Sequence, residues 1–245
     1  MNRNAETYFE KTGIPDTLSE TDPEFADFFG NFIFDEVVNE EGKTLDDETR
    51  YMCILAVLIG CQGYDVFRDM VGAALYFGVS PIVIKEVIYQ ATAYCGIGRV
   101  YPALKAANEV FKERNIAMPL EGQSTTNPEN RREMGTAKQM ELFGPQMENF
   151  WKNGNINRWL AANCFGDYYT RTPLNNAQRE MITFCYLAGQ GGCEPQLTSH
   201  AAANMMNGNS YDFLMCVISQ IMPYIGYPRT LNAISCLNKA AQPKE

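Results

Sequence analysis

Three residues in the second half of the chain have side chains suited to proton transfer or nucleophilic attack. They are Glu180, Cys193 and His200, and His200 is the only histidine among the 245 residues. Histidine is the side chain most often used in general acid–base catalysis. A cysteine at a helix N-terminus can react as a thiolate, because free N–H groups there lower its pKa. These residue types indicate either acid–base chemistry or thiol chemistry on a small molecule.

A helix is predicted to begin at Glu194-Pro195, because proline is favoured in the first turn and a carboxylate complements the helix dipole there. Cys193 then lies at the N-cap, where free N–H groups stabilise its thiolate and Glu194 opposes that effect. One stripe of this helix carries four of the candidate residues: Cys193, Gln196, His200 and Asn204.

Cys193 and His200 are about two helical turns apart, roughly 10.5 Å along the axis, which is too far for a direct hydrogen bond. Gln196 or a water molecule could connect them. Glu180 would have to come from the neighbouring helix. Each residue also has a structural interpretation: a lone histidine or cysteine often packs in a core, and Glu180 could be a solvated residue near a helix start.

The other cysteines have mostly apolar neighbours and are interpreted as small packing residues. The N-terminus has no apolar core and is not expected to be a secretory signal, so the thiols are expected to stay reduced in the cytoplasm. No Cys-x-x-Cys motif is present, and one histidine cannot build a histidine-rich metal site. We therefore expect neither a metal nor a cofactor.

The chain contains an internal repeat. Residues 45–50 (LDDETR) match residues 174–179 (LNNAQR) at a spacing of 129, and further matches follow at a spacing of 130. These later matches pair Gly78 with Gly208, Gln90 with Gln220, Tyr94 with Tyr224, Gly96 with Gly226, and Arg99 with Arg229. The change in spacing predicts a one-residue insertion in the second copy, within 189–192.

The two copies differ at the chemically interesting positions. Tyr51 stands where the second copy has Glu180, and Met70 stands where it has His200. No cysteine of the first copy matches Cys193. We therefore expect the second copy to carry the chemistry.

The halves are predicted to span 1–117 and 136–245, joined by a polar linker at 118–135 and packed on each other. Apolar runs at 52–60 and 181–189 predict buried central helices that end at glycine, and amphipathic helices are predicted around 83–91 and 213–221. No alternating strand pattern is present, so the fold class is all-α. An aromatic stripe near the N-terminus is expected to pack in the core: Phe25, Phe28, Phe29, Phe32 and Ile33.

Charge and hydropathy exclude two classes of partner. The net charge is −9 and no basic stripe is present, which makes nucleic acid a poor partner. No apolar run approaches the roughly 20 residues that a membrane span needs. A small molecule is therefore the expected partner.

Three segments of the second copy, LNNAQRE, HAAANMMNG and QIMPYIGYPRTLNA, resemble the carboxymuconolactone decarboxylase family. The first copy, with LDDETR, VGAALYFG and QATAYCGIGR, looks like a degraded second instance. The resemblance covers nearly the whole chain. It implies an all-α fold, and because single-repeat members form ring-like hexamers, it implies a homotrimer with pseudo-sixfold symmetry.

The family includes decarboxylases and thiol peroxidases of the alkylhydroperoxidase D type. By resemblance, Glu180, Cys193 and His200 match the Glu, the first Cys and the His of the peroxidase relay. Gln196 stands where the relay has its second Cys, so an outside thiol would have to resolve a sulfenate.

In the decarboxylase hypothesis, His200 is the general acid/base and Glu180 is its partner. Arg229 could hold a substrate carboxylate, although its match with Arg99 in the first copy favours a role in the fold or an interface. Gln196 and Asn204 are the other candidate substrate contacts.

The leading expectation is a cofactor-independent lyase acting on a small carboxylated lactone or a related acid. A one-Cys thiol peroxidase acting on a peroxide through Cys193 is the second. A non-catalytic oligomer that binds a small organic acid is the third.

Overall fold

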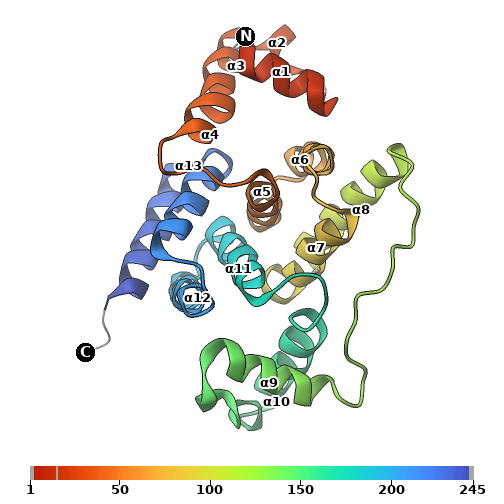
Figure 1. The fold of residues 1–245 in the computed structure, drawn as a ribbon, viewed down its shortest axis with the longest axis vertical. Coiled ribbons are helices and arrows are strands. Elements are labelled where there is room, and N and C mark those ends of the chain that lie inside the picture. The colour runs from red at the N-terminus through yellow and green to blue at the C-terminus, as the bar shows by residue number, and fades with distance from the viewer. Residues whose placement is uncertain (1–2, 15, 243–245) are drawn as a thin grey trace.

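The computed structural model describes residues 3–14 and 16–242, which form helices joined by loops and contain no strand (Figure 1). The all-α prediction is confirmed. The α-helices of the described residues are α1 (Arg3–Thr12), α2 (Leu18–Thr21), α3 (Pro23–Asn31), α4 (Val37–Asn39), α5 (Asp47–Cys61), α6 (Tyr64–Tyr76), α7 (Pro81–Cys95), α8 (Ile97–Glu113), α9 (Arg131–Phe143), α10 (Asn155–Trp159), α11 (Asn176–Gln190), α12 (Glu194–Met206) and α13 (Tyr211–Ala241). Two π-helical segments, η1 (Phe32–Glu36) and η4 (Leu160–Tyr168), and two 3-10 turns, η2 (Pro145–Met147) and η3 (Phe150–Lys152), complete them.

The repeat is visible in the helices. α5 and α11 each have 15 residues and begin at Asp47 and Asn176, whereas α6 and α12 each have 13 and begin at Tyr64 and Glu194. The spacing therefore changes from 129 to 130 between these helix pairs. The extra residue lies in the loop 191–193, which overlaps the predicted interval and corresponds to residues 62–63 of the first copy.

α13 corresponds to α7 and α8 together. It is kinked at Gly226, where φ is 73° and ψ is 169°, and Gly96 between α7 and α8 has nearly the same angles, 74° and 161°. Only glycine adopts this conformation without strain. The glycine shared by the two copies therefore redirects the chain between two helices.

The central helices begin at capping side chains that the two copies share in position. The side chain of Asp46 accepts a hydrogen bond from the Thr49 N–H at the start of α5. Asn175 does the same for the Gln178 N–H of α11, and the Gln178 side chain returns the bond in a capping box. The LDD and LNN motifs thus mark the same helix start in both copies.

The sequence predicted that the central helices end at Gly60 and Gly189, but α5 ends at Cys61 and α11 at Gln190, one residue later. Both glycines lie within their helices, where α5 and α11 cross in the middle of the molecule (Figure 1). A Cβ on Gly60 would lie 2.5 Å from the Tyr186 carbonyl oxygen, and one on Gly189 would lie 2.5 Å from that of Val57. Close packing of two helices, rather than chain termination, therefore requires glycine here.

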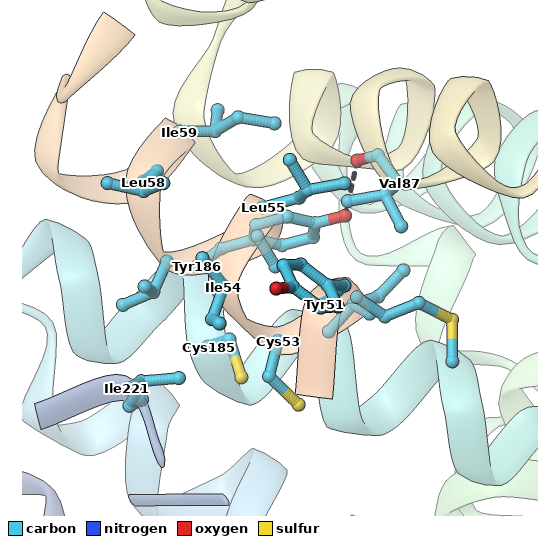
Figure 2. Close-up of a cluster of buried hydrophobic side chains, with 14 of the residues drawn as sticks. Tyr51, Cys53, Ile54, Leu55, Leu58, Ile59, Val87, Cys185, Tyr186 and Ile221 are labelled. Atoms are coloured by element: carbon cyan, nitrogen blue, oxygen red, sulfur yellow. Dashed lines mark hydrogen bonds between the residues drawn. The ribbon is translucent and has the colours of Figure 1, made fainter. Parts of the chain in front are cut away.

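The two halves share one core, as expected. Figure 2 shows side chains of α5, α7, α11 and α13 packed together, and the Tyr186 hydroxyl of the second half donates to the Val87 carbonyl of the first. Most of the labelled residues are completely or almost completely buried. Neither half therefore forms its core alone.

A buried polar cluster also joins the halves. Arg179 of α11 donates to Glu86 Oε2 at 3.2 Å and to Gln90 Oε1 at 2.7 Å, both on α7. Arg171 donates to both oxygens of Glu86, at 2.9 and 3.1 Å. Burial lowers the pKa of the Arg179 guanidinium, and the Glu86 carboxylate offsets this effect.

Two predictions about the segments outside the core need correction. Phe25 and Phe28 of the aromatic stripe are 43% and 60% exposed and stack on their own helix, because α3 lies at the edge of the molecule. The linker is shorter than predicted, since α9 begins at Arg131 and packs against η4 through Gly135. Among the described residues, no helix is long and apolar enough to cross a membrane.

Candidate functional site

Glu180 and His200 meet between α11 and α12. His200 Nδ1 lies 2.7 Å from Glu180 Oε2, within hydrogen-bonding distance. The Glu180 side chain is completely buried, whereas the His200 side chain is 12% exposed. The pair therefore places a buried carboxylate behind a histidine that solvent or a ligand can reach.

A chain of hydroxyl groups holds the other oxygen of the carboxylate. Tyr169 donates to Glu180 Oε1 at 2.9 Å, and the Tyr169 oxygen lies 2.7 Å from the Tyr94 hydroxyl and 2.8 Å from the Thr183 hydroxyl. Gln90 donates to Thr183 in turn, at 2.9 Å. Every hydroxyl can donate toward the carboxylate, which is the arrangement that stabilises a buried negative charge.

Burial raises the pKa of the Tyr169 and Tyr94 hydroxyls well above the usual value, and the nearby Glu180 carboxylate raises both further. Both side chains therefore remain neutral hydrogen-bond donors. Tyr94 belongs to α7 of the first half, so the site uses residues from both copies.

Aromatic rings surround the imidazole. The Tyr94 and Phe143 rings pack edge-on against His200, with centroids at 5.4 and 5.8 Å. Phe143 is the last residue of α9, and it also packs edge-on against Phe165 of η4. These rings limit the access of water to one side of His200.

Asn204 positions the two helices of the site. Its side-chain amide donates to the carbonyl oxygens of Glu180 and His200, at 2.9 and 2.7 Å, and its oxygen accepts from Asn209 at 2.7 Å. The residue is completely buried. The amide and carbonyl groups of Asn204 are therefore engaged within the protein, where they join the two helices of the site.

Cys193 lies at the N-cap of α12, as the helix-start pattern predicts. Its pKa is raised rather than lowered, because burial and the adjacent Glu194 outweigh the favourable Arg99 charge. The thiol donates to the Leu187 carbonyl at 3.4 Å. Within residues 3–14 and 16–242, no hydrogen bond joins Cys193 to Glu180 or His200.

The remaining two candidates lie apart from the pair. Gln196 is exposed one turn before His200, and in the described residues it forms no hydrogen bond to His200 or Cys193. Arg229 lines a small recess with Cys193 and Leu187. Its counterpart Arg99 donates to the Gly60 carbonyl at 2.7 Å, which caps α5 and supports the predicted fold role for this arginine position.

The corresponding place in the first copy has no acid–base pair. The Tyr51 hydroxyl donates to the Tyr8 hydroxyl at 3.4 Å, and the latter donates to Met70 Sδ at 3.6 Å. In the part of the chain that the structure describes, no group of three or more His, Cys, Asp or Glu side chains is arranged to hold a metal ion.

Sequence reasoning missed the residues that support the pair. Tyr169 and Thr183 gave no motif signal, and Phe143 comes from a helix that was partly assigned to the linker. Tyr94 did give a signal, because it matches Tyr224 in the repeat. Nothing in the spacing, however, connects Tyr94 with a site in the other half.

Comparison with known proteins agrees with this architecture. The model of the carboxymuconolactone decarboxylase family matches residues 23–109 and 155–239, one match in each half. A 4-carboxymuconolactone decarboxylase of Acinetobacter baylyi is 30% identical over 102 residues, which cover 42% of this chain and 75% of that protein.

A crystal structure titled as a gamma-carboxymuconolactone decarboxylase subunit of Burkholderia xenovorans is similar in fold. The TM-score is 0.52 at 18% identity, and the match covers 97% of this chain and 96% of that one. At this identity the similarity concerns the fold alone.

Proposed function

Because the chain belongs to the carboxymuconolactone decarboxylase family, we propose that it is a lyase that removes CO₂ from a small carboxylated lactone or a related acid. The observation that carries the proposal is the hydrogen bond between the buried Glu180 carboxylate and His200 Nδ1. This arrangement orients the His200 imidazole for proton transfer. A proton donor is the catalytic group that a cofactor-independent decarboxylation needs after CO₂ departs.

In the proposed reaction, the bond between the substrate carbon and its carboxylate breaks and CO₂ leaves. The electron pair stays on the carbon and delocalises into the lactone carbonyl as an enolate. Protonated His200 then delivers a proton to that carbon through Nε2, because Nδ1 is engaged with Glu180. Solvent restores the proton to the imidazole, so each turnover consumes one proton.

The surrounding residues have positioning roles in this proposal. Tyr169 and Asn204 fix the carboxylate and the two helices, so that His200 is held in one orientation. Gln196 lies on the same face of α12 as His200 and is exposed, which makes it a candidate for a substrate contact. Arg229 instead lies beside the loop 191–193, and we propose a structural role for it there.

The proposal is tested with 4-carboxymuconolactone, the compound named for the Acinetobacter relative, by following CO₂ release. His200→Ala is expected to lower kcat by roughly 10²- to 10⁴-fold, the usual contribution of a general acid or base. Glu180→Gln should also lower kcat strongly while leaving the fold intact. Ser199→Ala, the exposed neighbour on α12, is the control and should retain full activity.

Two outcomes would replace the proposal. Full turnover by His200→Ala would exclude a role for the acid–base pair. Thermal stabilisation by this lactone without CO₂ release would indicate a non-catalytic binding protein. The thiol peroxidase alternative has less support, because the Cys193 pKa is raised and Cys193 is not connected to Glu180 or His200 in the described residues.

A further inference from the structure

The first half contains a cavity of about 320 Å³ that the proposed reaction does not use. Its walls come from the N-terminal helices, the end of α5, α6 and one turn of α13. The lining is mostly apolar and includes Ile14, Phe29, Ile33, Met70, Pro223 and Tyr224. The volume lies at the lower end of the range typical of small-molecule sites, about 300–1,000 Å³.

The cavity occupies the place of the Glu180–His200 site in the other copy. At the repeat spacing of 130, Met70 corresponds to His200 and Tyr224 to Tyr94. Val66 at the cavity wall corresponds in the same way to Gln196. The first copy therefore has an apolar cavity where the second copy has the acid–base pair.

The charges of the lining favour a neutral ligand. The charged side chains among its described residues are those of Asp16 and Asp69, and no basic residue joins them. Burial raises the pKa of the Asp69 carboxyl above its usual value. A ligand carboxylate would meet like charges here without a cation to neutralise it, which disfavours organic acids.

One hydroxyl group in the lining is poorly paired. The Tyr224 hydroxyl donates to Met70 Sδ, at 3.8 Å. A thioether sulfur is a weak acceptor, so this hydroxyl gains energy by donating to an oxygen atom of a ligand instead. The lining thus offers apolar walls, one donor and carboxylate acceptors.

We propose that this cavity is a second binding site, which takes a neutral single-ring molecule carrying one hydroxyl group, of the phenol class. An apolar cavity of roughly 150 Å³ holds benzene in another protein, so this larger cavity has room for a substituted ring. The ligand hydroxyl would accept from Tyr224 and donate to Asp16 or Asp69. The inference is independent of the proposed decarboxylation.

Isothermal titration with phenol, toluene and benzoate tests the proposal on the full-length protein. Phenol should bind one site per chain, toluene more weakly, and benzoate without measurable affinity. Val66→Trp adds an indole ring at a position that is 44% exposed, so it should fill the cavity without unfolding the protein and abolish phenol binding. Gln196→Trp, the matched change in the other copy, should leave phenol binding unchanged.

Tyr224→Phe examines the hydrogen bond separately. It should weaken phenol binding by roughly fivefold and leave toluene binding unchanged. His200→Ala should lower the kcat of decarboxylation by roughly 10²- to 10⁴-fold and retain phenol binding, which separates the two sites. Absence of phenol binding, phenol binding that survives Val66→Trp, or benzoate affinity equal to that of phenol would each overturn the proposal.

Discussion

The identity of two residues separates the candidate site from its counterpart in the first copy. Glu180 carries a buried charge that needs hydrogen-bond donors, and His200 and Tyr169 lie within 2.9 Å of its oxygens. Tyr51 and Met70 at the corresponding positions carry no charge and need only weak partners. Loss of one member of the pair would leave the other without its hydrogen-bond partner, so we expect the two substitutions to occur together.

Cys193 is expected to be a slow nucleophile. Its raised pKa means that less thiolate is present at neutral pH than for a free cysteine, and that the thiolate fraction still increases above the usual thiol pKa. Peptide mass spectrometry should find slow alkylation of Cys193 by iodoacetamide at pH 7, with a rate that keeps rising beyond pH 9. Cys193→Ser should retain decarboxylation.

The opposite result is easily recognised. An alkylation rate that reaches its plateau below pH 7, together with loss of activity in Cys193→Ser, would restore the thiol mechanism. Cys236, buried in the same half, is the internal control because it should react even more slowly.

The residues of the site could be predicted from the sequence only in part. The contrast between the copies identified Glu180 and His200, and the Glu194-Pro195 pattern placed Cys193 correctly at the N-cap. The direction of its pKa shift was wrong, because burial depends on side chains that α11 and α13 bring to the thiol. Tyr94 was missed for a similar reason, since it reaches the site from the other half.

At the scale of the elements, the crossing of α5 and α11 fixes the position of Glu180. A Cβ on Gly189 would clash with the Val57 carbonyl, a backbone group that cannot move without shifting α5. Gly189→Ala should therefore lower the free energy of unfolding by about 1–3 kcal/mol, the usual cost of overpacking. Urea denaturation measures the change, and kcat should fall because α11 moves.

Gly98 of α8 is the matched control, since nothing lies within 4 Å of a Cβ built there. Gly98→Ala should leave stability unchanged or raise it by about 0.5–1 kcal/mol, because alanine restricts the unfolded chain. Equal effects of the two substitutions would show that the crossing does not depend on glycine.

The elements were predicted better than their ends and contacts. The apolar runs at 52–60 and 181–189 identified the central helices, because this signal is local in the sequence. The glycines at 60 and 189 were taken for helix ends, since sequence alone does not distinguish a terminating glycine from one at a helix crossing. That distinction depends on the neighbouring helix.

For the whole molecule, the apolar surface indicates self-association. Phe28 of α3 is 60% exposed, and Ile156 and Trp159 of α10, in the corresponding part of the second copy, are 65% and 56% exposed. The same kind of surface in both copies fits a ring in which each half contacts a neighbouring half. We therefore expect a homotrimer with six similar interfaces.

Light scattering coupled to size-exclusion chromatography should give the mass of three chains. Phe28→Glu should reduce that mass by placing a charge in an apolar interface, whereas Glu129→Lys in the linker should not. A wild-type protein that elutes as a single chain at micromolar concentration would contradict the trimer.

The buried ion pair between the halves should contribute more to stability than any exposed pair. The Glu86 and Arg179 side chains are 1% and 0% exposed, so Glu86→Ala would leave a buried guanidinium without its carboxylate. The expected loss is about 3–5 kcal/mol in the free energy of unfolding. Glu113→Ala, which removes the exposed partner of Arg68, should cost at most about 1 kcal/mol.

Because Gln90 and Tyr94 lie on the same helix as Glu86, activity should fall together with stability in Glu86→Ala but not in Glu113→Ala. Similar unfolding energies for the two variants would show that the halves are held together by apolar packing only.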